Sequence, residues 1–399
     1  MLALLPLAVC PAITAAADGQ EEVRALWVQG SSLTTPNAIA AMVRSARASG
    51  FNTLLVQARG RGDAYFVSHL EPRAAALINE PASFDPLEVV ISEARKANLR
   101  VHAWVNVNLI SNAGTLPIAR DHLVYAHPEW LMVPRALAVE LAGMDQRSPE
   151  YIGRLARFVR SQPAEIEGLY ASPLQQASAD HTVAVVADLV SRYALDGVHL
   201  DYVRFPNDEF DYSRQALALF RADLVPRLTD RERRQYDARA VSDPLVYVDT
   251  FPERWHDFRT SRLTAMIMRI RTAIKTLRPD VVLSAAVTPD PREASAKRLQ
   301  DWRTWIENGL LDVVCPMAYT TDPGVFQSQI ETVRQSAGLR PVWAGIGAYR
   351  LSSSETIENI LAARRLGAQG VILFSYDSLT RASSVADYLS DVGRAAFNH

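Results

Sequence analysis

The sequence predicts a single (β/α)8 barrel with long loops after its second, third and fourth strands. Short apolar runs rich in β-forming residues alternate with longer stretches of helical periodicity, which is the pattern of parallel βαβ units. Eight such runs occur along the 399 residues, and 48% hydrophobic residues supply enough apolar material for one large core. A doubly wound open sheet is the competing architecture, but no G-x-G-x-x-G motif follows the early runs to favour it.

The eight predicted strands cover residues 24–29, 53–59, 101–107, 197–203, 281–288, 312–319, 341–347 and 370–376. Helices are predicted between them, for example over residues 36–49, 86–97, 181–193, 254–277, 296–307 and 354–366. Two of these begin with a capping side chain followed by proline, at Thr35-Pro36 and Asp85-Pro86. The connections 60–85, 108–150 and 204–250 are unusually long, and each follows a strand. Because the loops after barrel strands build the active-site face, we expect these segments to serve binding.

The first 17 residues are predicted to be a signal peptide. They form a short apolar run that ends in small residues at Ala15 and Ala17, as before a cleavage site, and the run is too short to span a bilayer. Residues 18–399 would then form one barrel domain, secreted or periplasmic, with no integral membrane span. A lipid anchor on Cys10 is the alternative. Cys315, in an apolar run, is interpreted as a core residue.

The charge balance excludes a nucleic-acid-binding surface. The chain has 42 Lys and Arg against 44 Asp and Glu, whereas a phosphate-binding domain concentrates a clear excess of basic residues. No H-x-H or H-E-x-x-H spacing indicates a metal site, and no cofactor is predicted. The sequence does not indicate an oligomeric state.

Polar residues interrupt the predicted strands, mainly toward their C-terminal ends. Buried barrel strands should be almost entirely apolar, so these exceptions are informative. They lie two or four residues apart within a strand and are therefore predicted to share one face, at the open mouth of the barrel. The set is Gln29, Gln57, Arg59, His102, Asn106, Asn108, His199, Asp201, Ser284, Thr288, Asp290, Tyr319, Ser375 and Asp377.

These residues can support glycoside cleavage, which needs two carboxyl groups beside the scissile bond. Asp201 is the best catalytic candidate because it is the one acidic residue within a strand core at the mouth end. Its partner is predicted to be Asp290 or Asp377, and the loop acids Asp208 and Asp63 are further candidates. A buried ion pair or a helix cap is the alternative explanation for Asp201, Arg59 and Asp290.

The remaining polar and aromatic residues near the strand ends are predicted to bind a carbohydrate substrate. Aromatic rings can stack on sugar faces, although each ring alone is more often explained by packing, and His199 more often by a role in the core. The predicted binding residues are Trp27, Gln29, Gln57, Arg59, Trp104, Asn106, Asn108, His199, Tyr202, Arg204, Tyr319, Trp343 and Tyr376.

Five motifs together resemble the glycosyl-hydrolase-like 10 family of bacterial barrels. They are LDGVHLDYVRFP at 195–206, RALWV at 24–28, VHAWVN at 101–106, the block from Asp301-Trp302 to Tyr319, and GVILFSY at 370–376. The resemblance runs from about residue 23 to about residue 379. It implies a TIM barrel, a secreted or envelope location and hydrolysis of glycan, with peptidoglycan strands as one substrate among relatives. It also implies that Asp201 is functional.

Two looser likenesses leave the mechanism open. Family 18 chitinase-type barrels place their catalytic glutamate at the position of Val203, so their mechanism does not carry over. The alpha-amylase pattern fits Asp201 with His199 two residues before it, but no glutamate ends the fifth strand. The general acid is therefore not identified, and a glycan-binding barrel without turnover is the alternative function.

Overall fold

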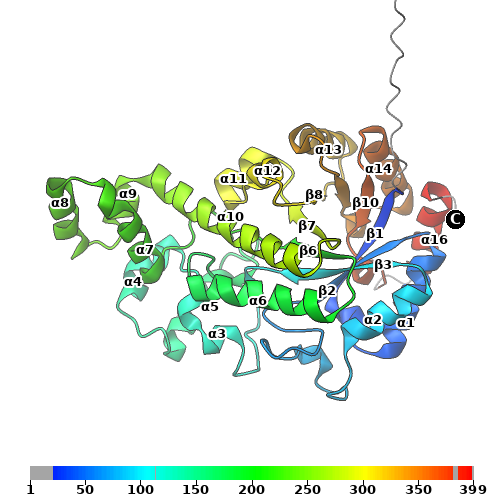
Figure 1. Ribbon diagram of the computed structural model, residues 1–399, viewed down its shortest axis with the longest axis horizontal. Coiled ribbons are helices and arrows are strands. Elements are labelled where there is room, and N and C mark those ends of the chain that lie inside the picture. Colours follow the sequence, from blue (N-terminus) through cyan, green and yellow to red (C-terminus); the bar gives the residue numbers. More distant parts are fainter. Residues whose placement is uncertain (1–20, 113, 381–384, 398–399) are drawn as a thin grey trace, which may run out of the picture.

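The computed structural model describes residues 21–112, 114–380 and 385–397. Within them, eight parallel strands close into a barrel in the spatial order β1, β2, β3, β6, β7, β8, β9, β10, with helices around the outside (Figure 1). These strands are β1 Val23–Val28, β2 Thr53–Arg59, β3 Arg100–Asn106, β6 Gly197–Asp201, β7 Val282–Val287, β8 Val313–Ala318, β9 Trp343–Ile346 and β10 Gly370–Leu373. The predicted (β/α)8 barrel is confirmed. The predicted signal peptide, 1–17, lies outside the described residues.

The helices follow the predicted segments closely. The α-helices are α1 Pro36–Ala48, α2 Pro86–Lys96, α3 Leu123–Ala126, α4 Ala138–Ala142, α5 Pro149–Arg160, α6 Gln176–Arg192, α7 Arg214–Leu224, α8 Asp230–Ala240, α9 Val246–Thr250, α10 Pro252–Leu277, α11 Pro291–Arg298, α12 Trp302–Glu307, α13 Pro323–Ala337, α14 Ser353–Arg365, α15 Tyr376–Thr380 and α16 Val385–Ala396. Short 3-10 turns are η1 Gly30–Leu33, η2 Ala75–Leu77, η3 Pro128–Trp130, η4 Arg135–Leu137, η5 Val225–Arg227 and η6 Ala348–Arg350. In the described part of the chain, no helix combines the length and the apolar character needed to cross a bilayer.

The expected helix caps form, and one predicted helix is broken. Thr35 and Asp85 accept hydrogen bonds from the third residue of α1 and α2, at 3.1 and 3.2 Å. The prediction of one helix over residues 296–307 is wrong. Leu299 adopts a left-handed conformation with φ 53°, which ends α11, and Asp301 then caps α12.

Two long excursions leave the barrel at the C-terminal ends of its strands. Between β3 and β6, the short strands β4 Leu109–Asn112 and β5 Gly168–Tyr170 pair antiparallel outside the barrel. Between β6 and β7, helices α7, α8 and α9 form an arm that projects away from the barrel, and α10 returns from it along α6 (Figure 1). The excursions therefore stand around the barrel mouth near β3 and β6.

The barrel interior is filled by bulky side chains. Along each strand, alternate residues face the helices or the barrel axis. Leu26, Val28, Val198 and Leu200 belong to the large core between sheet and helices. The inward cluster is built from Val23, Ala25, Trp27, Leu55, Trp104, Val313, Cys315, Trp343 and Ile372. The barrel is thus a packed core, open to ligands only beyond its strand ends.

Gly345 of β9 shows how tightly Trp27 fills this interior. A Cβ atom on Gly345 would lie 2.6 Å from the Pro316 carbonyl oxygen and 2.9 Å from the Trp27 ring. We expect Gly345→Ala to lower the free energy of unfolding by about 2 kcal/mol, because backbone and indole must both move. Gly143→Ala is the matched control: it ends α4 at φ −94° with no atom within 4 Å of an added Cβ. Equal effects of the two substitutions in urea denaturation would contradict this account.

Candidate active site at the barrel mouth

Asp201 is the last residue of β6 and faces the barrel axis. It lies two residues after His199 on the inward face, and its side chain is almost fully buried, with 9% of the residue exposed. The backbone N–H of Tyr202 donates to its Oδ1 at 2.7 Å. Tyr202 adopts a left-handed backbone conformation with φ 48°. This conformation costs energy for a residue with a Cβ atom, and residues that adopt it are found most often at functional sites.

The environment of Asp201 favours the protonated carboxyl. Burial is the main cause that raises its pKa to about 6, and the negative charge of Glu167 acts in the same direction. The Tyr202 amide, the Arg204 guanidinium and the Trp104 indole N–H oppose this rise. The indole N–H is shared between Asp201 and a residue of its own strand, since it donates to Asn106 Oδ1 of β3 at 2.8 Å. Asp201 can therefore carry a proton in mildly acidic solution.

Glu167 is a second carboxylate near Asp201 and was not among the predicted site residues. It directly precedes β5, in the excursion between β3 and β6. Arg204 Nη2 lies 2.6 Å from Glu167 Oε1, and the Tyr170 hydroxyl donates to Oε2 at 2.7 Å. Burial alone would raise the pKa of Glu167, but Arg204 and these hydrogen bonds outweigh it and lower the pKa. Glu167 is thus held ionised beside a carboxyl group that is easily protonated.

Aromatic side chains surround this carboxyl pair. The negative charge of Asp201 contributes, after burial, to a Tyr319 pKa well above its usual value, which places the two groups close together. Tyr319 contacts Phe374 and Tyr349, with ring centroids 5.4 and 6.3 Å apart. Tyr349 is 43% exposed and lies in η6, just after β9. Phe374 and Tyr349 were not among the predicted residues because they were hidden in apolar or loop sequence.

Polar residues at the end of β3 and just after it support the site from one side. Asn106 receives the Trp104 hydrogen bond, and Asn108 Nδ2 donates to the Arg204 carbonyl oxygen at 3.0 Å. Arg204 in turn lies over the Tyr202 ring, 4.9 Å from its centroid. The structure therefore brings seven of the predicted residues together at one part of the mouth. They are Asp201, Trp104, Asn106, Asn108, Tyr202, Arg204 and Tyr319.

Arg59 does not face this site, and a β-bulge is the reason. The pairing of β2 with β3 shifts between Gln57 and Arg59, so that Gln57 lies beside inward-facing Trp104 but Arg59 lies beside outward-facing Val105. The rule that residues two apart share a face fails at this point. Arg59 is 1% exposed and makes the buried ion pair that the sequence left open as the alternative.

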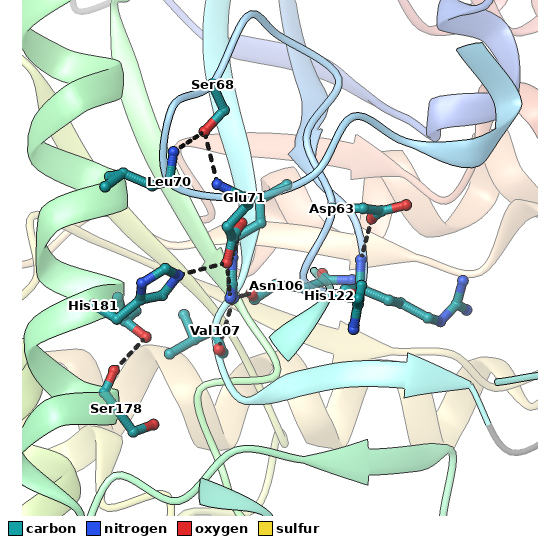
Figure 2. Close-up of polar contacts among 12 residues, drawn as sticks. Asp63, Ser68, Leu70, Glu71, Asn106, Val107, His122, Ser178 and His181 are labelled. Atoms are coloured by element: carbon teal, nitrogen blue, oxygen red, sulfur yellow. Dashed lines mark hydrogen bonds and ion pairs between the residues drawn. The ribbon is translucent and has the colours of Figure 1, made fainter. Parts of the chain in front are cut away.

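The ion pair joins Arg59 to Glu71 of the loop after β2. Figure 2 shows Glu71 with its second partner, His181. Arg59 Nε and Nη2 lie 2.8 Å from Oε2 and 2.5 Å from Oε1 of Glu71, and Nη1 donates to the carbonyl oxygens of Asn106 and Val107. His181 of α6 also points at this carboxylate, with Nε2 3.0 Å from Oε1. Although burial would raise it, these partners lower the pKa of Glu71 to about 2. One buried cluster thus ties the loop to β3 and α6.

The proposed partners of Asp201 are both held by local hydrogen bonds. Asp290 Oδ1 accepts from the backbone N–H groups of Arg292 and Glu293 at the start of α11. Asp377 accepts from the Gln29 backbone N–H and the hydroxyls of Ser31 and Ser32, each at 2.6 Å, and it is 2% exposed. Both acids lie at the rim of the barrel mouth. The contacts of Asp290 form a helix cap, which was the alternative to a catalytic role for this residue.

Four other predicted residues are placed in packing rather than at the opening. Trp27 is 1% exposed and donates through Nε1 to His199 Nε2 at 3.1 Å, while His199 Nδ1 contacts Ser284 Oγ at 2.9 Å. Burial lowers the pKa of His199 to about 3, so the ring is neutral. Trp343 begins β9 at the opposite end of the barrel, and Tyr376 hydrogen-bonds to Ser45 of α1. These contacts are with the barrel interior and with α1, and a contact of Trp343 or Tyr376 with substrate stays a prediction.

The remaining predicted residues lie around the rim. Gln29 follows β1 and is partly exposed, and Gln57 Oε1 accepts from the Gly30 backbone N–H at 3.1 Å. Asp63 lines a cavity in the loops after β2 and β4, and Asp208 lines another at the base of the helical arm. Among the described residues, no three His, Cys, Asp or Glu side chains are grouped so that they could hold a metal ion.

Comparison with known proteins agrees with this architecture. The family model described as Glycosyl hydrolase-like 10 matches residues 22–358. The chain belongs to the glycosyl hydrolase-like 10 family. The resemblance identified from the five motifs is thereby confirmed.

Curated relatives of this family carry the name glycosyl hydrolase. The chain is 25% identical over 298 residues to "Glycosyl hydrolase DigH" of Escherichia coli K12, covering 68% of this chain and 55% of that protein. It is 22% identical over 290 residues to "Glycosyl hydrolase YngK" of Bacillus subtilis, covering 68% and 46%. The chain thus spans about half the length of the curated relatives it matches.

Solved structures share the fold of this glycosyl hydrolase-like 10 chain. The glycoside hydrolase domain of PgaB (BpsB) from Bordetella bronchiseptica superposes with a TM-score of 0.64 at 16% identity, covering 94% of this chain and 99% of that domain. A β-galactosidase from Bacillus circulans sp. alkalophilus gives 0.63 at 12% identity, covering 94% and 56%. At these identities the likeness shows the barrel fold alone.

Breaking the Arg59–Glu71 ion pair should lower the free energy of unfolding substantially. Glu71→Gln leaves a buried guanidinium without its carboxylate, and we expect a loss of about 3 kcal/mol in unfolding free energy at pH 7. Because the folded-state pKa of Glu71 is depressed to about 2, its stabilisation is present above about pH 4.5 and is lost as the pH falls toward 2.

Urea denaturation of Glu71→Gln between pH 2 and 7 measures this effect. Glu150→Gln removes an exposed ion pair with Arg157 and is the matched control, with a small expected change. If Glu71→Gln were as stable as the control at pH 7, the cluster would not hold the loop.

Proposed function

We propose that the protein is a glycoside hydrolase that cleaves a polysaccharide or glycan, with peptidoglycan strands as a candidate substrate, and that Asp201 is its general acid. The observation that carries the proposal is the buried Asp201 carboxyl, which ends an inward-facing strand at the barrel mouth with its pKa raised to about 6. A general acid in glycoside cleavage needs a raised pKa so that it still holds a proton to donate. Membership of the family and the names of its relatives support the reaction class.

Glu167 is the second carboxylate of this proposal. Its pKa is lowered by Arg204 and Tyr170, so it remains ionised where Asp201 is protonated. Two nearby carboxyl groups with oppositely shifted pKa values can divide the roles of proton donor and of nucleophile or base. Tyr349, Tyr319 and Phe374 offer aromatic surface beside them for the sugar ring.

A glycan-binding barrel without turnover is the second candidate. It is favoured by the contacts of the acids other than Asp201, because Glu167 is bound by Arg204 and Tyr170 and Asp290 caps α11. Incubation with peptidoglycan and with plant and bacterial polysaccharides, followed by measurement of released reducing ends, separates the two. Binding without release under any condition would favour the module.

Asp201→Asn is expected to lower kcat at least about 100-fold, because the amide cannot donate the proton to the leaving oxygen. The same substitution should stabilise the fold. The raised folded-state pKa means that ionising Asp201 costs stability as the pH rises from about 4 to 6, so Asp201→Asn should gain up to about 3 kcal/mol at pH 8 and little at pH 4.

Reducing-end release and urea denaturation at both pH values test this pair of effects. Asp322→Asn is the matched control, since Asp322 also follows a barrel strand but only caps α13. Asp290→Asn, measured alongside, tests whether that acid does more than cap α11. Full activity of Asp201→Asn would refute the proposed role.

The pH profile gives a test of Glu167. Activity that requires protonated Asp201 should fall as the pH rises through about 6. Glu167→Gln removes the negative charge that raises the Asp201 pKa, so its reduced residual activity should have a falling limb at lower pH than the wild type. A limb that does not move, or activity that rises through pH 6, would contradict these roles.

A further inference from the structure

Arg204 is a buried cation beside the two carboxyl groups of the proposed site. It lies in the segment directly after β6, and 7% of the residue is exposed. A guanidinium this deeply buried is costly unless its charge and its N–H groups meet partners. Burial would lower the pKa of Arg204, but Tyr170 and Glu167 outweigh it and raise the pKa. Arg204 therefore stays charged and supplies no proton to the proposed reaction.

The Arg204 side chain lies over two tyrosine rings while it binds Glu167. Its Cζ atom is 4.9 Å from the ring centroid of Tyr202 and 6.0 Å from that of Tyr170. The two rings meet edge to face, with their centroids 6.2 Å apart. Contacts between a cation and an aromatic face strengthen when water is excluded. One guanidinium therefore connects the residue that follows β6 with the residue that ends β5.

Tyr202 is the link from Arg204 to Asp201. The Tyr202 backbone N–H donates to Asp201 Oδ1 at 2.7 Å, and Tyr202 is the residue with the left-handed φ of 48°. Because this conformation is unfavourable for a residue with a Cβ atom, the surrounding structure has to hold it in place. The guanidinium over the Tyr202 ring is one such restraint. The position of Arg204 therefore affects the hydrogen bond that Asp201 receives.

The backbone around this turn is fixed to the segment that follows β3. The Val107 backbone N–H donates to the Asp201 carbonyl oxygen at 2.8 Å. The Asn108 backbone N–H donates to the Tyr202 carbonyl oxygen at 3.2 Å. The Asn108 side chain then donates to the Arg204 carbonyl oxygen at 3.0 Å. The Arg204 side chain thus starts from an anchored backbone and ends at an ion pair.

Two charged groups near Asp201 act on it in opposite directions. Burial raises the pKa of each tyrosine in this region, so these side chains stay neutral. Arg61 of the loop after β2 acts on Tyr202 and is itself exposed. Glu167 raises the pKa of Asp201 and Arg204 lowers it. The ionisable groups that surround the pair are Glu167 and Tyr170 at β5, Tyr202 and Arg204 after β6, and Tyr319 after β8.

We propose that Arg204 is a positioning residue that holds both carboxyl groups of the site at once. Its ion pair fixes Glu167, with Nη2 2.6 Å from Oε1. Its contact with the Tyr202 ring fixes the turn whose N–H group binds Asp201. Arg204 acts through these residues and not on the substrate. The proposal rests on the proposed function in that the two carboxyl groups perform the cleavage.

Removing the charge of Arg204 should move the whole pH profile of activity. The guanidinium lowers the pKa of both carboxyl groups. In Arg204→Gln, the rising limb, which follows Glu167, should therefore move up by about one pH unit, and the falling limb, which follows Asp201, by at least about half a unit. Loss of packing alone would act oppositely on the falling limb, because water that reaches Asp201 lowers a pKa that burial has raised.

Arg204→Lys separates the charge from the shape of the side chain. Lysine keeps the positive charge, but it cannot lie flat on a ring while it binds Glu167. Both limbs should stay closer to the wild type than in Arg204→Gln, while kcat falls at least about tenfold because the two carboxyl groups are less well placed. Tyr170→Phe removes one hydrogen bond from Glu167, so it should raise the rising limb and leave the falling limb in place.

Arg135 provides the matched control. It also lies over a tyrosine ring, 5.3 Å from the Tyr212 centroid, and pairs with Asp249 at 2.6 Å, but at the base of the helical arm. Arg135→Gln should leave both limbs and kcat unchanged. Unmoved limbs in Arg204→Gln, or a falling limb at lower pH, would overturn the proposal. If Arg204→Gln does not fold, wild-type kcat in Arg204→Lys would overturn it instead.

NMR titration of the labelled Asp and Glu carboxyl carbons tests the same role without turnover. Asp201→Asn and Glu167→Gln identify the two signals, and both titration midpoints should rise in Arg204→Gln. Raised midpoints in a protein that releases no reducing ends would remove the hydrolase and keep the positioning role. Unmoved midpoints in a protein that cleaves glycan would remove the positioning role and keep the hydrolase, so the two failures are distinguishable.

Discussion

The filled interior of the barrel is the constraint on which the rest of the structure depends. Trp27, Trp104 and Trp343 occupy the axis with small partners such as Gly345, and no ligand can enter between the strands. Polar groups on the inward faces must therefore either bond to each other, as His199 does with Trp27 and Ser284, or emerge at the strand ends. Asp201 is the inward-facing acidic residue that emerges at a strand end. Its position follows from how the barrel is packed.

The chemistry of the mouth follows from the different charged neighbours of two buried carboxyl groups. Asp201 stands at the top of the aromatic packing, where it receives one backbone hydrogen bond and an indole contact but no ion pair among the described residues. Glu167 and Tyr170 reach the same region from the excursion between β3 and β6, and Glu167 pairs there with Arg204, which follows β6. Burial acts on both groups, and only Glu167 has a cation close enough to reverse it. The pKa difference therefore depends on Arg204, which follows β6 and pairs with the acid that the excursion brings to the mouth.

Strand periodicity was enough to predict the barrel and the inward face of Asp201, because alternation holds wherever the pairing register is regular. It failed at Arg59, where one extra residue in β2 moves the side chain to the outer face. It also failed at β10, where Phe374 occupies the inward position and Asp377, beyond the strand, turns to η1. Glu167 was missed for another reason. Its importance comes from Arg204 and Tyr170, which meet it only in the folded chain, and no local spacing in the sequence records that meeting.

The long loop after β2 is fixed to the barrel by its buried charges. Glu71 is fully enclosed, and an unpaired carboxylate there would be prohibitively costly, so the loop is committed to the one arrangement in which Arg59 and His181 meet it. The bulge that turns Arg59 outward leaves Gln57 as the residue of β2 that faces the mouth. The bulge therefore places Arg59 at Glu71 on the outer face, while Gln57, ahead of the bulge, keeps its regular inward position. In a regular β2, Arg59 would lie beside Asn106 on the inward face, and the loop would lose its buried anchor.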